Sequence, residues 1–446
     1  LMMSLWDALR MNMMISYQEL VRTFLSVLKN FSWMVIEKIV SVFGLIFVTS
    51  YVAKYIGPSA FGTIAFAISV FGIVQAVSLF GTETILFKRI SSNERSGIRL
   101  MLSAKKLRRS IFSVLATVLI IYFYFMTDTL TFVFCLAASI AAYFFSQDVI
   151  AIYNDAALNS KFNAFANVIG LGVSLLLRLV VVHANLDIKF LAIPIITTAV
   201  IPYYIRLSFF KMRHRGINGN RFRDRRYIIY MLYAGLPLAI SGISISIYTR
   251  LSQVLLAKFG TTAELGLFAA ANTLASSWAF ISLAFITSSF AIIYKESDRE
   301  KSINEAARLN GIVLLFCLVT VTLIIIFGRF FISVLYGEQY RDAYPIMIIL
   351  AVATAFSAMG PVAYRYIIKE SGYKFISYKT FFVFIINFPL SMFLISHYSV
   401  LGAAYSMLIT EFISLTVLNY LFNQGVVARI HIKTFNPFLY LKGKVR

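Results

Sequence analysis

Residues 188–227 read IKFLAIPIITTAVIPYYIRLSFFKMRHRGINGNRFRDRRY, a long apolar run followed by a short linker rich in arginine. A helix needs roughly 20 mainly apolar residues to cross the ~30 Å hydrocarbon core of a bilayer, and this run supplies them. The cations that follow are placed where anionic lipid headgroups would meet them. The same alternation recurs along the whole chain, which predicts a polytopic membrane protein of the all-α class.

Twelve membrane spans are predicted, and an even number places both termini on the same side of the membrane. The spans lie near residues 31–53, 62–86, 110–127, 130–152, 162–183, 188–210, 228–256, 263–293, 308–327, 343–368, 376–396 and 398–422.

The composition agrees with a membrane protein. The mean hydropathy is +0.81, 60% of the residues are hydrophobic and only 13% are charged. The net charge of +22, taken alone, would suggest a nucleic-acid-binding protein. Because the cations cluster in linkers beside the spans, we expect membrane lipids and no nucleic acid as their partners.

The positions of the 41 Lys and Arg residues predict the orientation of the chain. Nearly all of them fall in every second linker and in the two ends of the chain. By the positive-inside rule, those linkers and both termini are expected to be cytoplasmic, in a bacterial inner membrane. The few cations of the outer linkers are Lys54, Lys189, Lys258, Arg329 and Arg341, and those inside spans are Lys38, Arg178 and Arg250.

Two segments of the sequence match at a fixed offset of 204 residues. Ala53-Lys54-Tyr55, Phe61-Gly62 and Ala65 correspond to Ala257-Lys258-Phe259, Leu265-Gly266 and Ala269. Both segments join an odd span to the next even one, which indicates a parallel repeat of six spans about an axis along the membrane normal. Two like halves of six helices are typical of a transporter.

The repeat divides the chain into two lobes and three further segments. An N-lobe (31–210) and a C-lobe (228–422) are joined by a basic cytoplasmic linker (211–227) that serves as the hinge. Residues 1–30 are predicted to form either an interfacial helix or a partly ordered tail, without a cleavable signal peptide, and 423–446 form a basic cytoplasmic tail. The two cysteines lie in different spans and indicate neither a disulfide nor a metal site.

Several short motifs resemble those of a known family. They are Glu37-Lys38, the stretch YVAKYIGPSAFG (51–62), LFGTE (79–83) with Lys88-Arg89, LGLFAAA (265–271) and GAA (402–404). These motifs resemble the Wzx-type polysaccharide flippases, in the polysaccharide transporter family of the multidrug/oligosaccharidyl-lipid/polysaccharide exporter superfamily. The resemblance covers roughly residues 31–425.

The resemblance implies a function and partners. It implies alternating-access translocation of an undecaprenyl-diphosphate-linked oligosaccharide from the cytoplasmic to the outer leaflet, for O-antigen, capsule or exopolysaccharide assembly. The implied partners are the polyprenyl-diphosphate-linked glycan, membrane lipids, and a polysaccharide polymerase with its chain-length machinery.

Charged and polar residues inside the spans are the candidate substrate-binding residues, since a charge at the centre of a span costs about 2.5–3.5 kcal/mol on insertion scales. Arg178 shares a helix face with Asn163, Asn167 and Ser174, and Arg250 shares one with Gln253. Arginine and lysine can both bind the phosphate oxygens of a lipid diphosphate. Alternatively, Lys38 pairs with Glu83 or extends to the headgroups, and Arg250 forms a structural ion pair between the lobes. The predicted substrate-binding residues are Lys38, Arg178, Arg250, Asn163, Asn167, Ser174, Gln75 and Gln253.

Three acids near inner span ends, Glu83, Asp148 and Glu411, are candidates for coupling transport to a proton or a sodium ion; the alternative is an interfacial role. No other cofactor, no metal and no catalytic residue is predicted, so we expect a transporter and not an enzyme. The rival functions are a cation-coupled multidrug or metabolite antiporter of the same superfamily and a membrane glycan polymerase or ligase. Pro237, which follows Gly235, is the predicted functional kink.

Overall fold

The computed structural model describes residues 2–214, 224–437 and 439, and the side chains within these ranges except at 2–36, 224–226 and 291–292. The described chain is helical and contains no strand. Ten of its helical segments are long and apolar enough to span a membrane. Two of these, Glu37–Leu79 and Tyr373–Tyr420, have 43 and 48 residues, enough for two crossings each. The predicted all-α membrane protein with about twelve spans is therefore confirmed.

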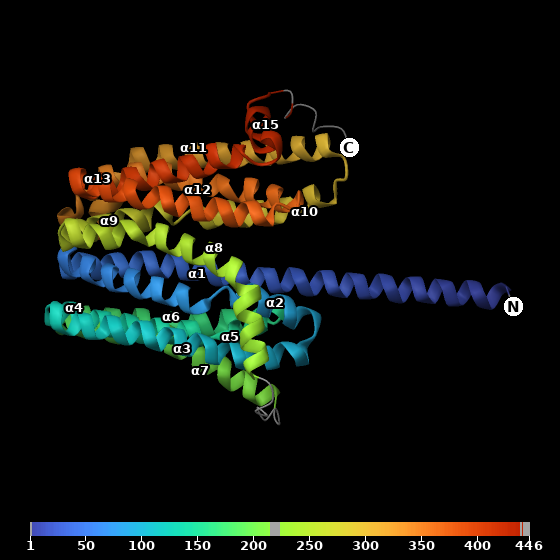
Figure 1. Ribbon diagram of the computed structural model, residues 1–446, viewed down its shortest axis with the longest axis horizontal. Coiled ribbons are helices and arrows are strands. Elements are labelled where there is room, and N and C mark those ends of the chain that lie inside the picture. Colours follow the sequence, from blue (N-terminus) through green and yellow to red (C-terminus); the bar gives the residue numbers. More distant parts are fainter. Residues whose placement is uncertain (1, 215–223, 438, 440–446) are drawn as a thin grey trace.

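The helices fall into two groups that lie side by side (Figure 1). In the N-lobe, α1 (Met2–Leu79) is followed by α2 (Thr82–Ser92), α3 (Glu94–Met126), α4 (Thr129–Gln147), α5 (Val149–Ala156), α6 (Ser160–His183), η1 (Ile188–Leu191) and α7 (Ala192–Arg213). The C-lobe holds α8 (Asp224–Phe259), α9 (Thr262–Ser276), α10 (Ala279–Lys295), α11 (Arg299–Tyr336), η2 (Glu338–Tyr340), α12 (Ala343–Lys369), α13 (Tyr373–Leu415), α14 (Val417–Tyr420), η3 (Asn423–Gly425) and α15 (Val426–Thr434).

The bundle has two distinct ends. The cation-rich linkers lie at one of them, on the right of Figure 1 with α2 and α15, which we call the basic end. The N-terminal part of α1 extends beyond the bundle on this side. Residues 2–30 of the segment predicted as interfacial (1–30) belong to this extension, and their side chains lie outside the described residues. Residues 215–223 of the linker and 440–446 of the tail also lie outside the described residues.

Backbone breaks turn each of the two long helices back at the opposite end. Gly57 has φ 81°, in the left-handed region that glycine adopts without a steric penalty, and Pro58 begins the returning half of α1. In α13 the break is at Ser399, with φ 46°. Between α3 and α4, Asp128 caps α4 by accepting hydrogen bonds from the backbone N–H groups of Leu130 and Thr131. A further hydrogen bond, from the Thr131 hydroxyl, lowers the pKa of Asp128.

At the opposite end the two lobes touch through the repeated segments. A Cβ on Gly62 would lie 1.8 Å from the carbonyl oxygen of Thr262, and a Cβ on Gly266 would lie 1.9 Å from that of Pro58. The residues of one contact correspond to those of the other at the same offset of 204, Gly62 to Gly266 and Pro58 to Thr262. Such a reciprocal contact is what a two-fold relation between like halves produces, and it accords with the predicted parallel repeat. The Ser59 and Thr262 hydroxyl oxygens are 2.7 Å apart across this seam.

Further contacts strengthen the same seam. The Tyr340 hydroxyl of η2 donates to the carbonyl of Ala53 at 3.1 Å, and the Gln339 amide donates to the carbonyl of Lys54. Ala53 and Phe61 of α1 also belong to the buried apolar cluster of the C-lobe. We call these contacts together the outer seam, because sequence analysis places them on the outer side.

Helix α8 connects the lobes and is bent along its length (Figure 1), and Pro237 lies inside this helix. Its first turns pack on the N-lobe, where Met231 lies in a buried cluster with Leu86 and Met101. A Cβ on Gly235 would lie 2.8 Å from the Phe80 carbonyl, so the α1–α2 turn fits closely against the bend. The chain thus passes from one lobe to the other at this bend, beyond the linker predicted as the hinge.

Adding a methyl group to the outer seam tests its packing. We expect Gly62→Ala and Gly266→Ala each to destabilise the protein by about 1–3 kcal/mol, the usual cost of overpacking, because backbone rather than a mobile side chain occupies the space. Thermal unfolding of the purified protein measures this. Gly172→Ala on α6 is the matched control, since a Cβ there would meet nothing within 4 Å. Equal unfolding midpoints for all three variants would contradict the described contact.

Candidate functional site

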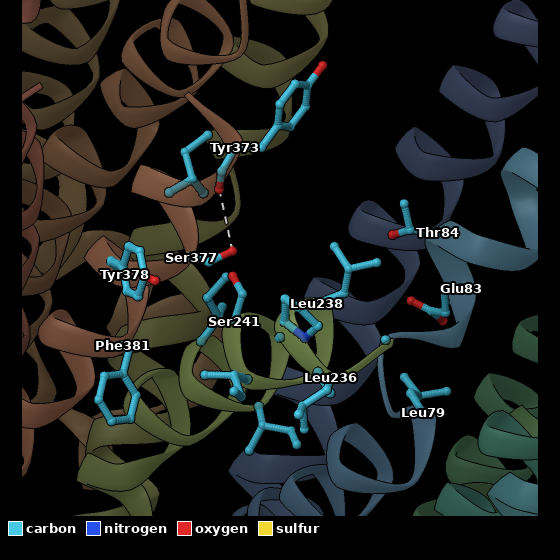
Figure 2. Close-up of a pocket in the computed structure, with 18 of the residues that line it drawn as sticks. Leu79, Glu83, Thr84, Leu236, Leu238, Ser241, Tyr373, Ser377, Tyr378 and Phe381 are labelled. Carbon is cyan, nitrogen blue, oxygen red and sulfur yellow. Dashed lines mark hydrogen bonds between the residues drawn. The ribbon is translucent and has the colours of Figure 1, made fainter. Parts of the chain in front are cut away.

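The two lobes separate towards the basic end and enclose a cavity of about 940 Å³. Its walls come from the end of α1 with the start of α2, from the bend of α8, and from the first turns of α13. Figure 2 shows Glu83 and Thr84 on one side of the cavity, with Tyr373 and Ser377 across from them. The cavity is therefore lined by residues of both lobes, towards the basic end.

Arg250 lies between α8 and α1, just beyond the end of the cavity that faces the outer seam, which we call its closed end. On α8 it follows the lining residue Ile245 by about one turn, and on α1 its neighbour Gly72 precedes the lining residue Ala76 by one turn. A Cβ on Gly72 would lie 2.5 Å from the guanidinium carbon of Arg250, so the guanidinium packs directly against the α1 backbone at this glycine. One turn further on, Gln253 accepts a hydrogen bond from the Ser69 hydroxyl.

The environment of Arg250 lacks an anion. Among the residues that the structure describes, it makes no ion pair, and the side chain is partly buried. A guanidinium in this position has five N–H donors to satisfy, and a phosphate can accept two of them side by side. Arg250 is thus a group next to the cavity that can bind an anion.

Arg178 lies elsewhere, inside the N-lobe. Its guanidinium donates to the Thr49 hydroxyl of α1 at 2.7 Å, and within the described chain it too has no ion pair. Ser174, one turn earlier on α6, donates to the Pro194 carbonyl at 2.8 Å. The polar face of α6 therefore packs against α1 and α7 and does not line the large cavity.

The same face of α6 lines a second, small cavity of about 130 Å³. Asn163 donates to the Asp155 carboxylate at 2.8 Å, and Asn167 donates to the Glu37 carboxylate at 3.1 Å. Arg206 of α7 donates in turn to the Asn167 side-chain oxygen. Two of the predicted substrate-binding asparagines are thus members of a polar network within the N-lobe.

Asp148 is the centre of that network. It forms an ion pair with Arg206, in which both side chains are 6% exposed, and it also interacts electrostatically with Arg108. Arg108 is buried and donates to the Thr82 hydroxyl at 2.8 Å and to the Ser146 carbonyl at 3.1 Å. Asp148 therefore pairs with Arg206, while buried Arg108 interacts electrostatically with both Glu83 and Asp148.

The remaining predicted residues lie apart from each other. Glu83 is exposed in the large cavity, and its electrostatic partner is Arg108. Lys38 is exposed and makes no ion pair with the described residues. Gln75 is partly buried on α1, one residue before the cavity lining. Glu411 is buried in the C-lobe, hydrogen bonded to Ser357.

Three charged residues that the charge pattern assigns to linkers lie within the lobes, namely Arg108, Arg206 and Lys379. Arg108 and Arg206 are buried, and Lys379 interacts electrostatically with Glu411. A helical pattern could have revealed Arg108, because it shares a face with the apolar residues Met101 and Ala104.

The described chain thus forms two helical lobes with a cavity between them. Over 93% of both chains, the fold is similar to that of the lipid II flippase MurJ in an inward closed conformation, with a TM-score of 0.66 at 17% identity. An inward-facing multidrug resistance MATE family transporter of the MOP superfamily also has a TM-score of 0.66, at 16% identity over 90% of this chain and 96% of that one. A MOP superfamily transporter from Pyrococcus furiosus has a TM-score of 0.56 at 14% identity, over 90% of this chain and 96% of that one.

The family model described as polysaccharide biosynthesis protein matches residues 27–293. The chain belongs to this family, as the resemblance of its motifs predicted. No curated protein matches the sequence.

Asp148→Asn distinguishes a structural role of this acid from a coupling role. The change removes the counter-charge of buried Arg206 and weakens the electrostatic interaction with Arg108, and breaking a buried pair typically costs about 3–5 kcal/mol. We expect a lower yield of folded protein and a lower thermal midpoint. Glu305→Gln, at an exposed position on α11, is the control. Normal stability of Asp148→Asn together with lost transport would instead favour coupling.

Proposed function

We propose that this protein is a flippase that moves a polyprenyl-diphosphate-linked oligosaccharide from the cytoplasmic to the outer leaflet of a bacterial inner membrane. The observation that carries the proposal is the cavity between the lobes, which is closed at the outer seam and has the unpaired Arg250 beyond its closed end. Membership of the polysaccharide biosynthesis family supports a glycan as cargo. The printed name of one structural neighbour, a lipid II flippase, is consistent with a lipid-linked cargo.

The proposed mechanism is alternating access. The cation-rich linkers at the basic end favour a cytoplasmic location for that end, and the cavity then faces the leaflet where the substrate is made. The glycan enters the cavity while the polyprenyl chain stays in lipid, and Arg250 binds phosphate oxygens in a bidentate fashion. Separation of Gly62 from Thr262 and Gly266 from Pro58 would open the outer side as the α8 bend closes the inner one.

Coupling and partners stay predictions. Asp148 is paired with Arg206 and Glu83 faces the cavity, so Glu411 is the acid whose buried position beside Lys379 best suits coupling to a proton or sodium ion. A polymerase and chain-length machinery would receive the product, in O-antigen, capsule or exopolysaccharide assembly.

The sidedness of lipid-linked glycan in cells that lack the gene tests the proposal, with a membrane-impermeant sugar-oxidising reagent as the probe. We expect single repeat units to accumulate, protected, in the cytoplasmic leaflet. Single units that reach the outer leaflet without being polymerised would contradict the proposal and favour a polymerase. Unchanged glycan with altered drug tolerance would favour the antiporter.

Variants of Arg250 in the same assay test the anion-binding group. Loss of a charge-assisted hydrogen bond costs about 1.5–3 kcal/mol, so Arg250→Ala should lower export roughly ten- to a hundredfold. Arg250→Lys keeps the charge but loses the bidentate geometry, and should retain part of the export. Arg341→Ala, at an exposed position outside the spans, is the control. Full export by Arg250→Ala would exclude this residue from substrate binding.

A further inference from the structure

One wall of the large cavity is unusually rich in aromatic side chains. Tyr373, Tyr378 and Phe381 follow each other along the first turns of α13, and Tyr364 comes from the end of α12. Tyr373 and Tyr378 are 63% and 65% exposed, and both line the cavity (Figure 2). The wall therefore presents aromatic surface to whatever fills the space between the lobes.

The aromatic wall is accompanied by hydroxyl groups. Ser377 lies between the aromatic residues and donates to the Tyr373 carbonyl at 3.4 Å, and Ser241 of α8 is 3.0 Å from the Thr380 hydroxyl. Both hydroxyl oxygens keep acceptor capacity, because a serine oxygen has two lone pairs. Aromatic rings carry negative charge on their faces, which suits the polarised C–H groups on the flat side of a pyranose ring, while hydroxyls suit its rim.

Glu83 stands across from this wall (Figure 2). Arg108, buried behind it, interacts with it electrostatically, and among the described residues Glu83 forms no ion pair within the cavity. The other charged residue of the lining is Lys374 on α13. An ionised carboxylate accepts hydrogen bonds from sugar hydroxyls or from an amino group, and it repels another carboxylate.

Resting on the proposed function, we infer that the wall formed by Tyr373, Tyr378 and Phe381 stacks sugar rings, and that Glu83 selects neutral or amino sugars against uronic acids. In this proposal the glycan and the anionic diphosphate of the substrate bind at different places. Glycan lies between the aromatic wall and Glu83, whereas the diphosphate is bound by Arg250 at the closed end. The position of Glu83 thus limits which repeat units the transporter accepts.

Saturation-transfer difference NMR on the full-length protein in lipid nanodiscs tests this inference, because it reports sugar protons that lie close to the protein, and the variants described below test the contribution of the aromatic ring. The probes are maltotriose, fully deacetylated chitotriose and trigalacturonate. We expect transfer to the ring protons of the first two, and at least threefold less to trigalacturonate. Glu83→Gln should raise the trigalacturonate signal towards that of maltotriose. An equal or stronger signal from trigalacturonate with the unaltered protein would overturn the inference.

Substitutions in the aromatic wall are the second part of this NMR experiment. Tyr378→Ala should reduce the maltotriose signal by more than half, while Tyr378→Phe, which keeps the ring, should retain it. Tyr398→Ala is the matched control, because Tyr398 is on the same helix and 61% exposed but does not line the cavity. A maltotriose signal unchanged by Tyr378→Ala would also overturn the inference.

The two proposals can fail separately. If cells without the gene trap lipid-linked glycan but the purified protein gives no maltotriose signal, the sugar-stacking wall is wrong and the flippase stands. If maltotriose binds as expected but no glycan is trapped, the wall binds sugar and the proposed function is wrong.

Discussion

The close approach of the two repeated segments at the outer seam is the contact on which the rest of the structure depends. Helices in a bilayer gain little from hiding apolar surface, since lipid is equally apolar, so their association relies on tight packing of small residues. Gly62 and Gly266 bring backbone against backbone there. Because the lobes are held together at that end, they can separate at the basic end, where the large cavity forms.

Some arginines of the bundle have an acidic partner within their lobe and others do not. Arg206 forms an ion pair with Asp148, and Arg108 interacts electrostatically with Glu83 and Asp148, so both arginines have acidic partners within the N-lobe. Arg178 and Arg250 have no such partner in the described part of the chain. An unbalanced charge among spanning helices is costly and calls for water or a ligand. Arg250 meets this condition beside a cavity, whereas Arg178 lies within one lobe.

Much of the fold followed from the sequence, and the contacts between side chains did not. Hydropathy located the spans because lipid demands an unbroken apolar helix, and the matched segments at 53–65 and 257–269 pointed to the seam. The helix that contains the predicted span 110–127 begins earlier, at Glu94, and includes the buried Arg108. Hydropathy does not predict this burial, since it depends on residues distant in the sequence. The aromatic wall at Tyr378 could not be predicted, because an exposed aromatic residue has the same sequence pattern whether it faces lipid or a cavity.

Reversible cross-linking of the outer seam tests the central claim most directly. In Ser59→Cys/Thr262→Cys, the two sulfur atoms would replace hydroxyl oxygens that are 2.7 Å apart. Glycan export is measured in cells before oxidation, after it, and after reduction, with the single-cysteine variants as controls. If the lobes alternate between two open sides, oxidation should stop export and reduction should restore it. Undiminished export by quantitatively cross-linked protein would contradict the account.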